Sequence, residues 1–327
     1  MHAEADRARE PRLVPMALSL GKKDSATVGL DVDGSFLAAA LLDGRSIGRV
    51  ASMDLPPGVT TDGEVREPEA LADALRDMFT TFKLPRRVRL GVSNQQIVVR
   101  QLEMPIIDNK AERDAAVRFQ AAEAIAMPLE EAILYYQPIG VTEGEDGVVR
   151  QRLLLVAARA SMVDRLMEAV RGAGLRPDGI DLNAFALVRM LSDGEYPEPE
   201  GQQPARVLCH LSGMTNLAIA SGSMCLFTRP LQTVWSPDDE GVVSSLSEEI
   251  RLSIDFHMAQ PNARRVESIV LSGPGAGDPR LSEELGARTN LPVSVGEPLG
   301  PFGVHAVPTG EDPFRYTVAA GLAMGVD

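Results

Sequence analysis

Short apolar runs separated by Asp-Gly pairs begin at residue 27. Apolar residues dominate 27–32, 36–42 and 47–53, and Asp33-Gly34 and Asp43-Gly44 stand between these runs. Asp-Gly favours the two-residue turn of a β-hairpin, because glycine adopts positive φ without strain and aspartate tolerates it. The pattern therefore predicts a meander of three antiparallel strands.

A helix and a further strand are predicted after the meander. Pro68 suits the first turn of a helix, where the N–H that proline lacks would have no partner within the helix. The apolar run 88–92 predicts the strand. The apolar residues that recur at helical spacing and share one face are Leu71, Leu75, Met78, Phe79 and Phe82.

The same order of patterns returns at residue 207. Apolar runs at 207–211, 215–220 and 224–228 are separated by Ser212-Gly213 and Ser221-Gly222. They predict a second three-strand meander.

A helix, a strand, a helix and a strand are predicted to follow the second meander. Ser245 and Glu248 have the spacing of a capping box, which predicts the start of the first helix. The later elements are expected at 268–271, 281–289 and 292–295. Because three strands, a helix, a strand and a helix occur twice in this order, we predict an α/β protein with two duplicated βββαβα lobes.

Residues between the two copies predict a small α+β insert. Three runs are strand-like: 98–104, 133–140 and 152–158. Asn109 and Glu112 predict the start of a helix that ends at Met127, before Pro128; Ser161 and Asp164 predict another that ends at Gly172 or Gly174. Glu143–Gly147 is the expected acidic hairpin tip of this insert.

These patterns divide the chain into five parts. We expect the leader to be mobile and propose that translation begins at Met16. Pro and Gln concentrate in 195–204, which predicts a linker. The parts are a leader (1–25), the first part of lobe one (26–93), the insert (94–178), the return to lobe one with the linker (179–204), and lobe two with a C-terminal helix (205–327).

Composition excludes several classes of function. The 32 Lys and Arg against 46 Asp and Glu give a net charge of −14, which disfavours binding to nucleic acid. The only lysines are Lys22, Lys23, Lys83 and Lys110, and none follows a glycine-rich loop, so a P-loop is excluded. Two cysteines, Cys209 and Cys225, suit a reducing compartment and small buried apolar positions.

The ordered motifs of the chain resemble the actin-like (ribonuclease H-like) ATPase fold, and within it the PilM family of type IV pilus assembly proteins, a branch similar to FtsA. The resemblance covers about residues 26–327 and rests on motifs at 28–32, 98–105, 126–128, 155–159, 173–177 with 180–181, 226–229, 271–273 and 320–323. It implies that the insert is an FtsA/PilM-type (SHS2) module. It also implies a nucleotide site at the hairpin tips.

The first phosphate motif of the family resembles D-I-G-S-S, followed by a lysine. Here it is Asp31-Val32-Asp33-Gly34-Ser35, and Ala38 stands near the place of the lysine. Asp31 is kept as the implied Mg²⁺ ligand, while Asp33 would face phosphate with a negative charge. A plain Asp-Gly hairpin explains the same residues.

The other two motifs also depart from the family. The second resembles D-I-G but is His210-Leu211-Ser212-Gly213 here, so its carboxylate is absent. His210 in a strand is more often a core histidine than a ligand. The third resembles S-G-G, but Pro274 follows Gly273 and offers no N–H.

We therefore expect weak or absent ATP hydrolysis, with ATP and Mg²⁺ as the cofactors that the resemblance implies. An active actin-like ATPase or sugar kinase is the alternative. A dinucleotide fingerprint at Gly273–Gly277, with Glu297 downstream, is a minor one, because Asp278 stands near the third glycine position. The residues expected to contact nucleotide are Asp31, Asp33, Gly34, Ser35, Ser212, Gly213, Thr215, Asn216, Gly273 and Gly275.

The resemblance implies a scaffold in the cytoplasm, at the inner face of the cytoplasmic membrane. Its expected partners are the N-terminal tail of a PilN-like bitopic membrane protein and the pilus assembly motor ATPase. Because no apolar run approaches the length of a membrane helix, we expect membrane association to be indirect. A division protein like FtsA would call for a C-terminal amphipathic membrane helix, and residues 321–327 do not show one. A type II secretion homologue is a further alternative.

Overall fold

The computed structural model describes residues 12–13 and 27–325, apart from 45, 145–146, 193–202, 237, 261–262 and 303–305. The proposed start at Met16 and most of the predicted linker lie outside the described residues. Contacts divide the chain into two compact units. The smaller holds Gln96–Asp164 with the N-terminal residues, and the larger holds the residues from 17 to 95 and from 165 onward.

The first sheet of the larger unit contains the predicted meander. Its strand order is β11-β7-β2-β3-β4. β2, β3 and β4 pair antiparallel, and β7 pairs parallel with both β2 and β11. The strands are β2 (Val28–Val32), β3 (Phe36–Asp43), β4 (Ser46–Asp54), β7 (Arg87–Val92) and β11 (Arg176–Leu182).

The second sheet of this unit repeats the first. Its order is β14-β13-β12-β15-β16, and its pairs are parallel and antiparallel at the same places. The predicted duplication is therefore confirmed at the level of the sheets. The strands are β12 (Ala205–His210), β13 (Asn216–Ser221), β14 (Met224–Pro230), β15 (Val266–Ser272) and β16 (Val293–Val295).

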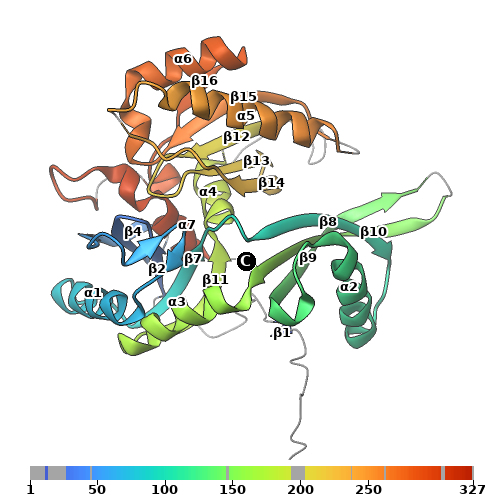
Figure 1. The fold of residues 1–327 in the computed structure, drawn as a ribbon, viewed down its shortest axis with the longest axis horizontal. Coiled ribbons are helices and arrows are strands. Elements are labelled where there is room, and N and C mark those ends of the chain that lie inside the picture. Colours follow the sequence, from blue (N-terminus) through green and yellow to red (C-terminus); the bar gives the residue numbers. More distant parts are fainter. Residues whose placement is uncertain are drawn as a thin grey trace, which may run out of the picture. The chain divides into compact units, whose positions relative to one another are not determined.

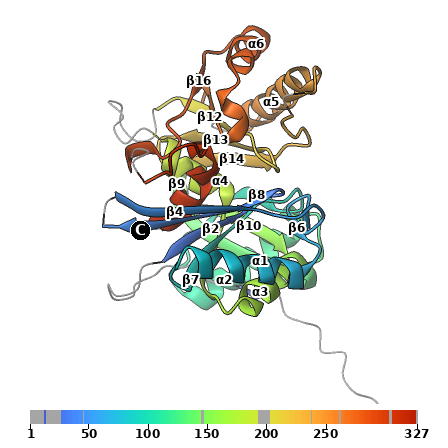
Figure 2. The same cartoon turned by 90° about the vertical axis from the view of Figure 1, so that its left-hand side faces the viewer.

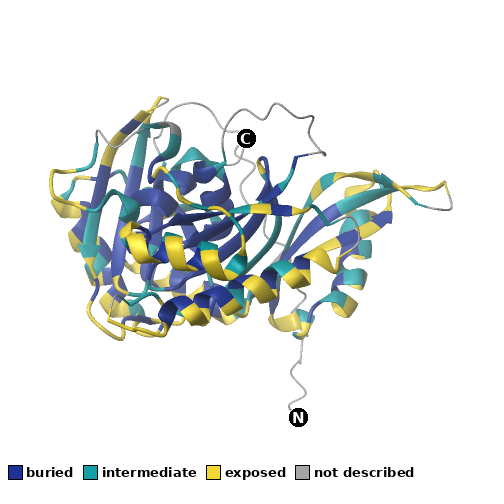
Figure 3. Cartoon of the chain, turned by 90° about the horizontal axis from the view of Figure 1, so that it is seen from above, coloured by how far each residue is buried: buried dark blue, intermediate teal, exposed yellow. Residues whose placement is uncertain are grey.

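Amphipathic helices cover the outer face of each sheet. α1 (Pro68–Thr81) and α3 (Ala160–Gly172) lie on the first sheet, and α5 (Val242–Met258) and α6 (Pro279–Thr289) lie on the second (Figures 1 and 2). Figure 3 shows the outer faces of such helices as exposed, with the buried residues concentrated on the strands and inner faces. Pro68 is the first residue of α1, as predicted, and the helix buries Leu71, Leu75, Met78 and Phe79.

Two predicted helix starts are wrong. α5 begins at Val242 with Gly241 as its N-cap, so Ser245 and Glu248 lie within the helix and form no capping box. Val242, Val243 and Leu246 all enter the core of the second lobe, and this burial carries the helix one turn further toward the N-terminus. α3 begins at Ala160, so Ser161 lies inside it.

Two further helices pack on the inner side of the sheets, between the lobes (Figure 1). α4 (Asn183–Leu191) was not predicted, and α7 (Thr317–Met324) is the predicted C-terminal helix. Both are buried almost all round, with Leu187, Val188 and Leu322 among their core residues. α7 packs on α4, β2 and β3, which brings the end of the described chain against its first lobe.

The smaller unit is one sheet covered by one helix. The strand order is β1-β9-β10-β8, and Val117 and Ala121 of α2 pack on the sheet. Asn109 caps α2 as predicted, since its Oδ1 accepts bonds from the N–H of Ala111 (2.9 Å) and Glu112 (3.3 Å). The elements are β1 (Arg12–Leu13), β8 (Val98–Pro105), α2 (Lys110–Ala124), β9 (Ala132–Glu143) and β10 (Val149–Arg159).

Three features of this region differ from the expected pattern. α2 ends at Ala124 rather than Met127, because Ile125 turns to an extended conformation and its side chain enters the core of the unit. Within the predicted leader, Arg12–Leu13 pairs parallel with Ile133–Leu134 of β9. The predicted insert, 94–178, includes α3 and the start of β11, but β11 is an edge strand of the first sheet. α3 and β11 of the first lobe correspond to α6 and β16 of the second.

The remaining short elements are β5 (Thr60–Thr61), β6 (Glu64–Val65), and the 3-10 turns Leu129–Glu131, Pro274–Gly277, Gly300–Phe302 and Pro313–Tyr316. Of the helices that the described residues form, none is both long and apolar enough to span a bilayer.

Candidate functional site

The tips of the two corresponding hairpins touch. Asp33 and Gly34 form the turn between β2 and β3, and Gly213 lies in the turn between β12 and β13. The N–H of Gly213 donates to both carboxylate oxygens of Asp33, at 3.0 and 3.1 Å. A Cβ added to Gly34 would lie 3.5 Å from the Cα of Gly213, so the two backbones approach closely. A carboxylate from the first lobe therefore bonds the turn of the second.

Asp33 is buried and surrounded by donors. Only 6% of it is exposed, and the N–H of Ser35 also donates to its Oδ1 (3.3 Å). Burial raises the pKa of Asp33, against the lowering effect of hydrogen bonds from Ser212, Ser35 and Gly213. Thr60 Oγ1 donates to the carbonyl oxygens of Asp33 and Gly34, both at 3.2 Å, which fixes the turn from the other side.

Asp31 lies in β2, just before this turn. It is 2% exposed, and Asn183 Nδ2 donates to its Oδ1 at 3.2 Å. Burial, and then the nearby charge of Asp33, raise the pKa of Asp31 to about 8, while the bond from Asn183 lowers it. Without a cation beside it, its carboxyl group is therefore mainly protonated at neutral pH.

The polar side chains of the second tip are satisfied largely within the protein. Ser212 Oγ donates to the carbonyl of Met214 (3.1 Å), as does Asn216 Nδ2 (2.8 Å). Ser93 Oγ, at the end of β7, donates to Asn216 Oδ1. Thr215 is fully buried, and its Oγ1 has no hydrogen-bond partner among the described residues.

His210 is a core histidine. Its Nδ1 lies 3.3 Å from Ser272 Oγ, and burial lowers its pKa to about 4. The ring is therefore neutral at pH 7. It supplies no negative charge to replace the carboxylate of the second motif.

The glycine turn after β15 packs on the second tip. Gly273 has a φ of +86°, and a Cβ there would overlap the backbone of Leu211. The N–H of Gly275 donates to the carbonyl of Leu211 (3.3 Å). A Cβ on Gly275 would overlap the indole of Trp235, so this ring lies directly against the turn.

The structure brings the predicted residues to three adjoining turns, but it also adds four that the sequence did not indicate. Thr60 and Trp235 contact the turns themselves, and Asn183 and Ser93 bond the strand residues Asp31 and Asn216 beside them. Asn183 lies on the unpredicted helix α4, and no motif marks it. Trp235 is the only tryptophan of the chain, which is the one feature of the sequence that could have drawn attention to it.

These residues do not fit a Mg²⁺-bound phosphate in this geometry. The N–H of Gly213, which would face an anion, already bonds Asp33, and Asp31 is buried with Asn183 bonded to its Oδ1. Among the described residues, no group of three or more His, Cys, Asp or Glu side chains is placed to hold a metal ion. No step of ATP hydrolysis can be derived from this arrangement.

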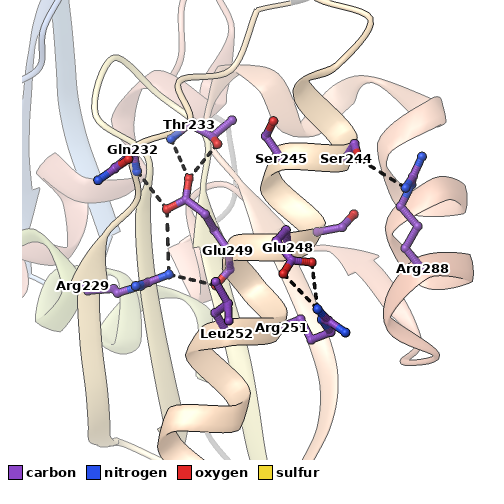
Figure 4. A pocket seen from close by; sticks show the side chains of 11 residues that line it. Arg229, Gln232, Thr233, Ser244, Ser245, Glu248, Glu249, Arg251, Leu252 and Arg288 are labelled. Atoms are coloured by element: carbon purple, nitrogen blue, oxygen red, sulfur yellow. Dashed lines mark hydrogen bonds and ion pairs between the residues drawn. The ribbon is translucent and has the colours of Figure 1, made fainter.

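A separate polar pocket of about 890 Å³ lies on the second lobe (Figure 4). Its lining comes from the end of β14, the following loop, α5 and α6. Glu249 accepts bonds from the N–H of Gln232 (3.0 Å) and from the N–H and Oγ1 of Thr233 (2.8 and 2.7 Å), and it pairs with Arg229 (3.8 Å). Burial alone would raise the pKa of Glu249, but these bonds together lower it. None of the residues predicted to contact nucleotide lines this pocket.

Solved structures with the same fold include three that cover nearly the whole chain. A PilM–PilN type IV pilus biogenesis complex matches with a TM-score of 0.74 at 22% identity, over 91% of this chain and 97% of that one. The ethanolamine utilization protein EutJ from Carboxydothermus hydrogenoformans matches with a TM-score of 0.52 at 11% identity, over 93% of this chain and 91% of that one. The cytoplasmic domain of EpsL, an inner membrane component of the type II secretion system of Vibrio cholerae, matches with a TM-score of 0.50 at 11% identity, over 93% of this chain and 97% of that one.

These likenesses confirm the predicted actin-like α/β fold. The sequence itself gives the family, because residues 38–232, more than half of the chain, match the model of the type IV pilus assembly protein PilM. This segment begins just after the first hairpin tip, and it includes the second tip at Gly213 and the whole of the smaller unit apart from its N-terminal strand. The chain belongs to the PilM family of type IV pilus assembly proteins.

Proposed function

We propose that this protein is a cytoplasmic scaffold of type IV pilus assembly that docks the N-terminal tail of a PilN-like bitopic inner-membrane protein. The observation that carries the proposal is the family match, together with the likeness to a PilM–PilN complex over 91% of the chain. Scaffolding needs a stable surface rather than a reaction. The closely packed hairpin tips suit such a role.

The tail would bind as an extended segment. β8 (Val98–Pro105) is an edge strand of the smaller unit, with β10 on one side only among the described strands. An edge strand offers free backbone N–H and C=O groups to an added strand, and side-chain pockets then give specificity. β8 also carries one of the motifs on which the family resemblance rests.

Membrane association would run through this partner. A net charge of −14 repels anionic lipid headgroups but attracts a basic tail. We therefore place the protein at the inner face of the cytoplasmic membrane, with the motor ATPase of pilus assembly as a second partner.

Hydrolysis of ATP would be weak or absent. Phosphoryl transfer needs a positioned base and cations that stabilise the transferred phosphate. The tips supply a buried Asp31, a carboxylate on Asp33 and a neutral His210 instead.

Two measurements test the proposal. The first is binding of a synthetic tail peptide from the bitopic protein encoded beside this gene, with a scrambled peptide as control; we expect saturable binding of the native order alone. The second is phosphate release from Mg-ATP. Turnover that Asp31→Ala abolishes would favour the alternative, an active ATPase.

A further inference from the structure

One carboxylate joins the turns of two lobes that lie 180 residues apart in sequence. Asp33 accepts from Gly213 across the lobes and from Ser35 within its own turn. We propose that Asp33 is a built-in substitute for a bound anion, which holds the two hairpin tips together and keeps phosphate groups out. This inference deepens the part of the proposed function that concerns the nucleotide site, and it conflicts with the nucleotide-binding role that the fold implies.

The geometry at Gly213 is that of an anion held by backbone donors. N–H groups at glycine turns are common anion sites, because the backbone can approach without a Cβ. Here both oxygens of Asp33 face the N–H of Gly213, and a Cβ on Gly213 would overlap the carboxylate. The position is therefore filled by a side chain of the protein, with no gap for another residue's atoms.

A phosphate that entered would have to displace Asp33 and then lie beside it. Asp31 is near enough for its charge interaction with Asp33 to count. Within the described residues, neither carboxyl group forms an ion pair with an arginine or lysine. A phosphate would thus add negative charge to a buried region that already holds two carboxyl groups and lacks a facing cation, which is unfavourable.

The neighbouring turn is filled in the same way. The indole of Trp235 lies against Gly275, and the Gly275 N–H is bonded to Leu211. Leu211 leads directly into the tip that Asp33 holds. The protein's own side chains thus occupy both turns, so the arrangement of the tips would not depend on a ligand.

Asp33→Ala tests the inference, with Asp33→Asn as the conservative variant and Asp43→Ala as the matched control. Asp43 belongs to the other Asp-Gly hairpin of the same sheet and is exposed. Two quantities are measured on the full chain: hydrogen exchange of peptides that contain Gly34–Ser35 and Gly213, and binding of Mg-ATP and of inorganic pyrophosphate by calorimetry.

We expect Asp33→Ala to speed exchange at both tips by about tenfold or more, because a bond to a charged acceptor is lost. We also expect it to gain saturable binding of pyrophosphate or Mg-ATP that wild type and Asp43→Ala lack. Asp33→Asn, which keeps one acceptor oxygen, should lie between them and keeps the test valid if the alanine variant fails to fold.

Two results would overturn the inference: wild type that binds these ligands as tightly as the variants, or exchange at Gly213 that Asp33→Ala and Asp33→Asn leave unchanged. Tail binding is measured separately. Loss of the pilus role would therefore show in the peptide experiment alone, while failure of the Asp33 inference would show in exchange and ligand binding.

Discussion

Burial raises the pKa of Asp31, an effect that its position in a sequence motif does not reveal. The residue lies in β2, and its Oδ1 accepts a hydrogen bond from the amide of Asn183 at the start of α4. Asn183 Oδ1 is itself buried and has no hydrogen-bond partner in the part of the chain that the structure describes. A protonated Asp31 is the state that this apolar setting favours, because an ionised carboxylate there would lack compensation for its lost hydration.

Asp31 should therefore make stability fall as pH rises. Its folded pKa of about 8 lies above the unfolded value of 3.8, so between these values the folded state holds a proton that the unfolded state releases. Asp31→Asn removes this term. Relative to wild type, the free energy of unfolding of Asp31→Asn should increase by about 1.4 kcal/mol per pH unit across this window.

Chemical denaturation at several pH values, with both proteins in the same buffers, measures this difference. Asp43→Asn, on the exposed hairpin, serves as the control and should follow the wild-type curve. Parallel curves for wild type and Asp31→Asn would show that Asp31 is ionised in the folded protein and free to hold a metal.

The sequence located these side chains but could not give their state. Asp33 and Gly213 were predicted at hairpin tips and Asp31 in the strand before the first tip, and the structure places them there. The bond between Asp33 and Gly213 depends on the relative position of two lobes, and Asn183 reaches Asp31 from a helix that no pattern marked. The burial and protonation state of these carboxyl groups depend on contacts between segments far apart in sequence, so they cannot be predicted from the local spacing of residues.

At the scale of elements, two glycine motifs are explained by close packing. A Cβ on Gly29 in β2 would overlap backbone atoms of Ala319 and Ala323 in α7, and one on Gly321 would overlap Ala186 in α4. Strand β2, α7 and α4 approach so closely because glycine and alanine face one another. These positions serve the joint between the lobes rather than a ligand.

Gly29→Ala should destabilise the protein by about 1–3 kcal/mol or more, because the backbone of α7 has to move to admit the methyl group. Gly277→Ala is the matched control, since a Cβ there meets nothing within 4 Å. Chemical denaturation of both variants measures the difference. An equal loss of stability in the two variants would mean that α7 moves away from β2 at little cost in free energy.

The C-terminal end of α7 is held by two arginines. Arg189 Nε donates to the carbonyl of Gly321 (2.9 Å), and Arg89 Nη1 donates to that of Leu322 (3.1 Å). Cations are favourable at the negative end of a helix. Arg189 also pairs with Asp181, which is 1% exposed.

Arg189→Leu should therefore cost about 3 kcal/mol, because the buried carboxylate of Asp181 loses its ion pair and keeps only the N–H of Leu182 and the nearby charge of Arg89. The double variant Asp181→Asn/Arg189→Leu should recover part of this loss. Arg251→Leu, which breaks an exposed pair with Glu248, should have only a small effect. Denaturant titration measures the free energy of unfolding of each variant. Equal losses of stability in the single and double variants would mean that the charge of Asp181 does not cause the loss.

Elements with a clear local pattern were predictable, and those without one were not. The apolar runs of β2, β3, β13 and β14, with Asp-Gly pairs between them in the first copy and Ser-Gly pairs in the second, predicted both meanders. α4 has only 9 residues and no side-chain cap, so neither a long apolar stripe nor a capping residue marked it in the sequence. The cap of α5 was misplaced because core burial, rather than a side-chain cap, sets where that helix begins.

At the scale of the whole molecule, duplication explains most of the architecture. The two sheets share one strand order, and the smaller unit enters between β7 and α3, where the second lobe has only the turn after β15. The repeat of turn residues made this predictable. The pairing of Arg12–Leu13 with β9 was not, since it joins segments about 120 residues apart by two residues without a recognisable pattern.

The net charge of −14 leads to a prediction about partner binding. If a basic tail docks on this acidic protein, electrostatic attraction should speed its association, and salt should weaken that attraction. Between about 0.01 M and about 0.15 M salt the Debye length falls from about 30 to about 8 Å. We expect the association rate constant of the tail peptide to fall by about tenfold across this range, while the dissociation rate changes less.

Stopped-flow fluorescence measures both rates, and a peptide with glutamine at its basic positions is the control that should lose the salt dependence. An association rate that salt leaves unchanged would mean that the tail binds through apolar contacts and backbone pairing alone.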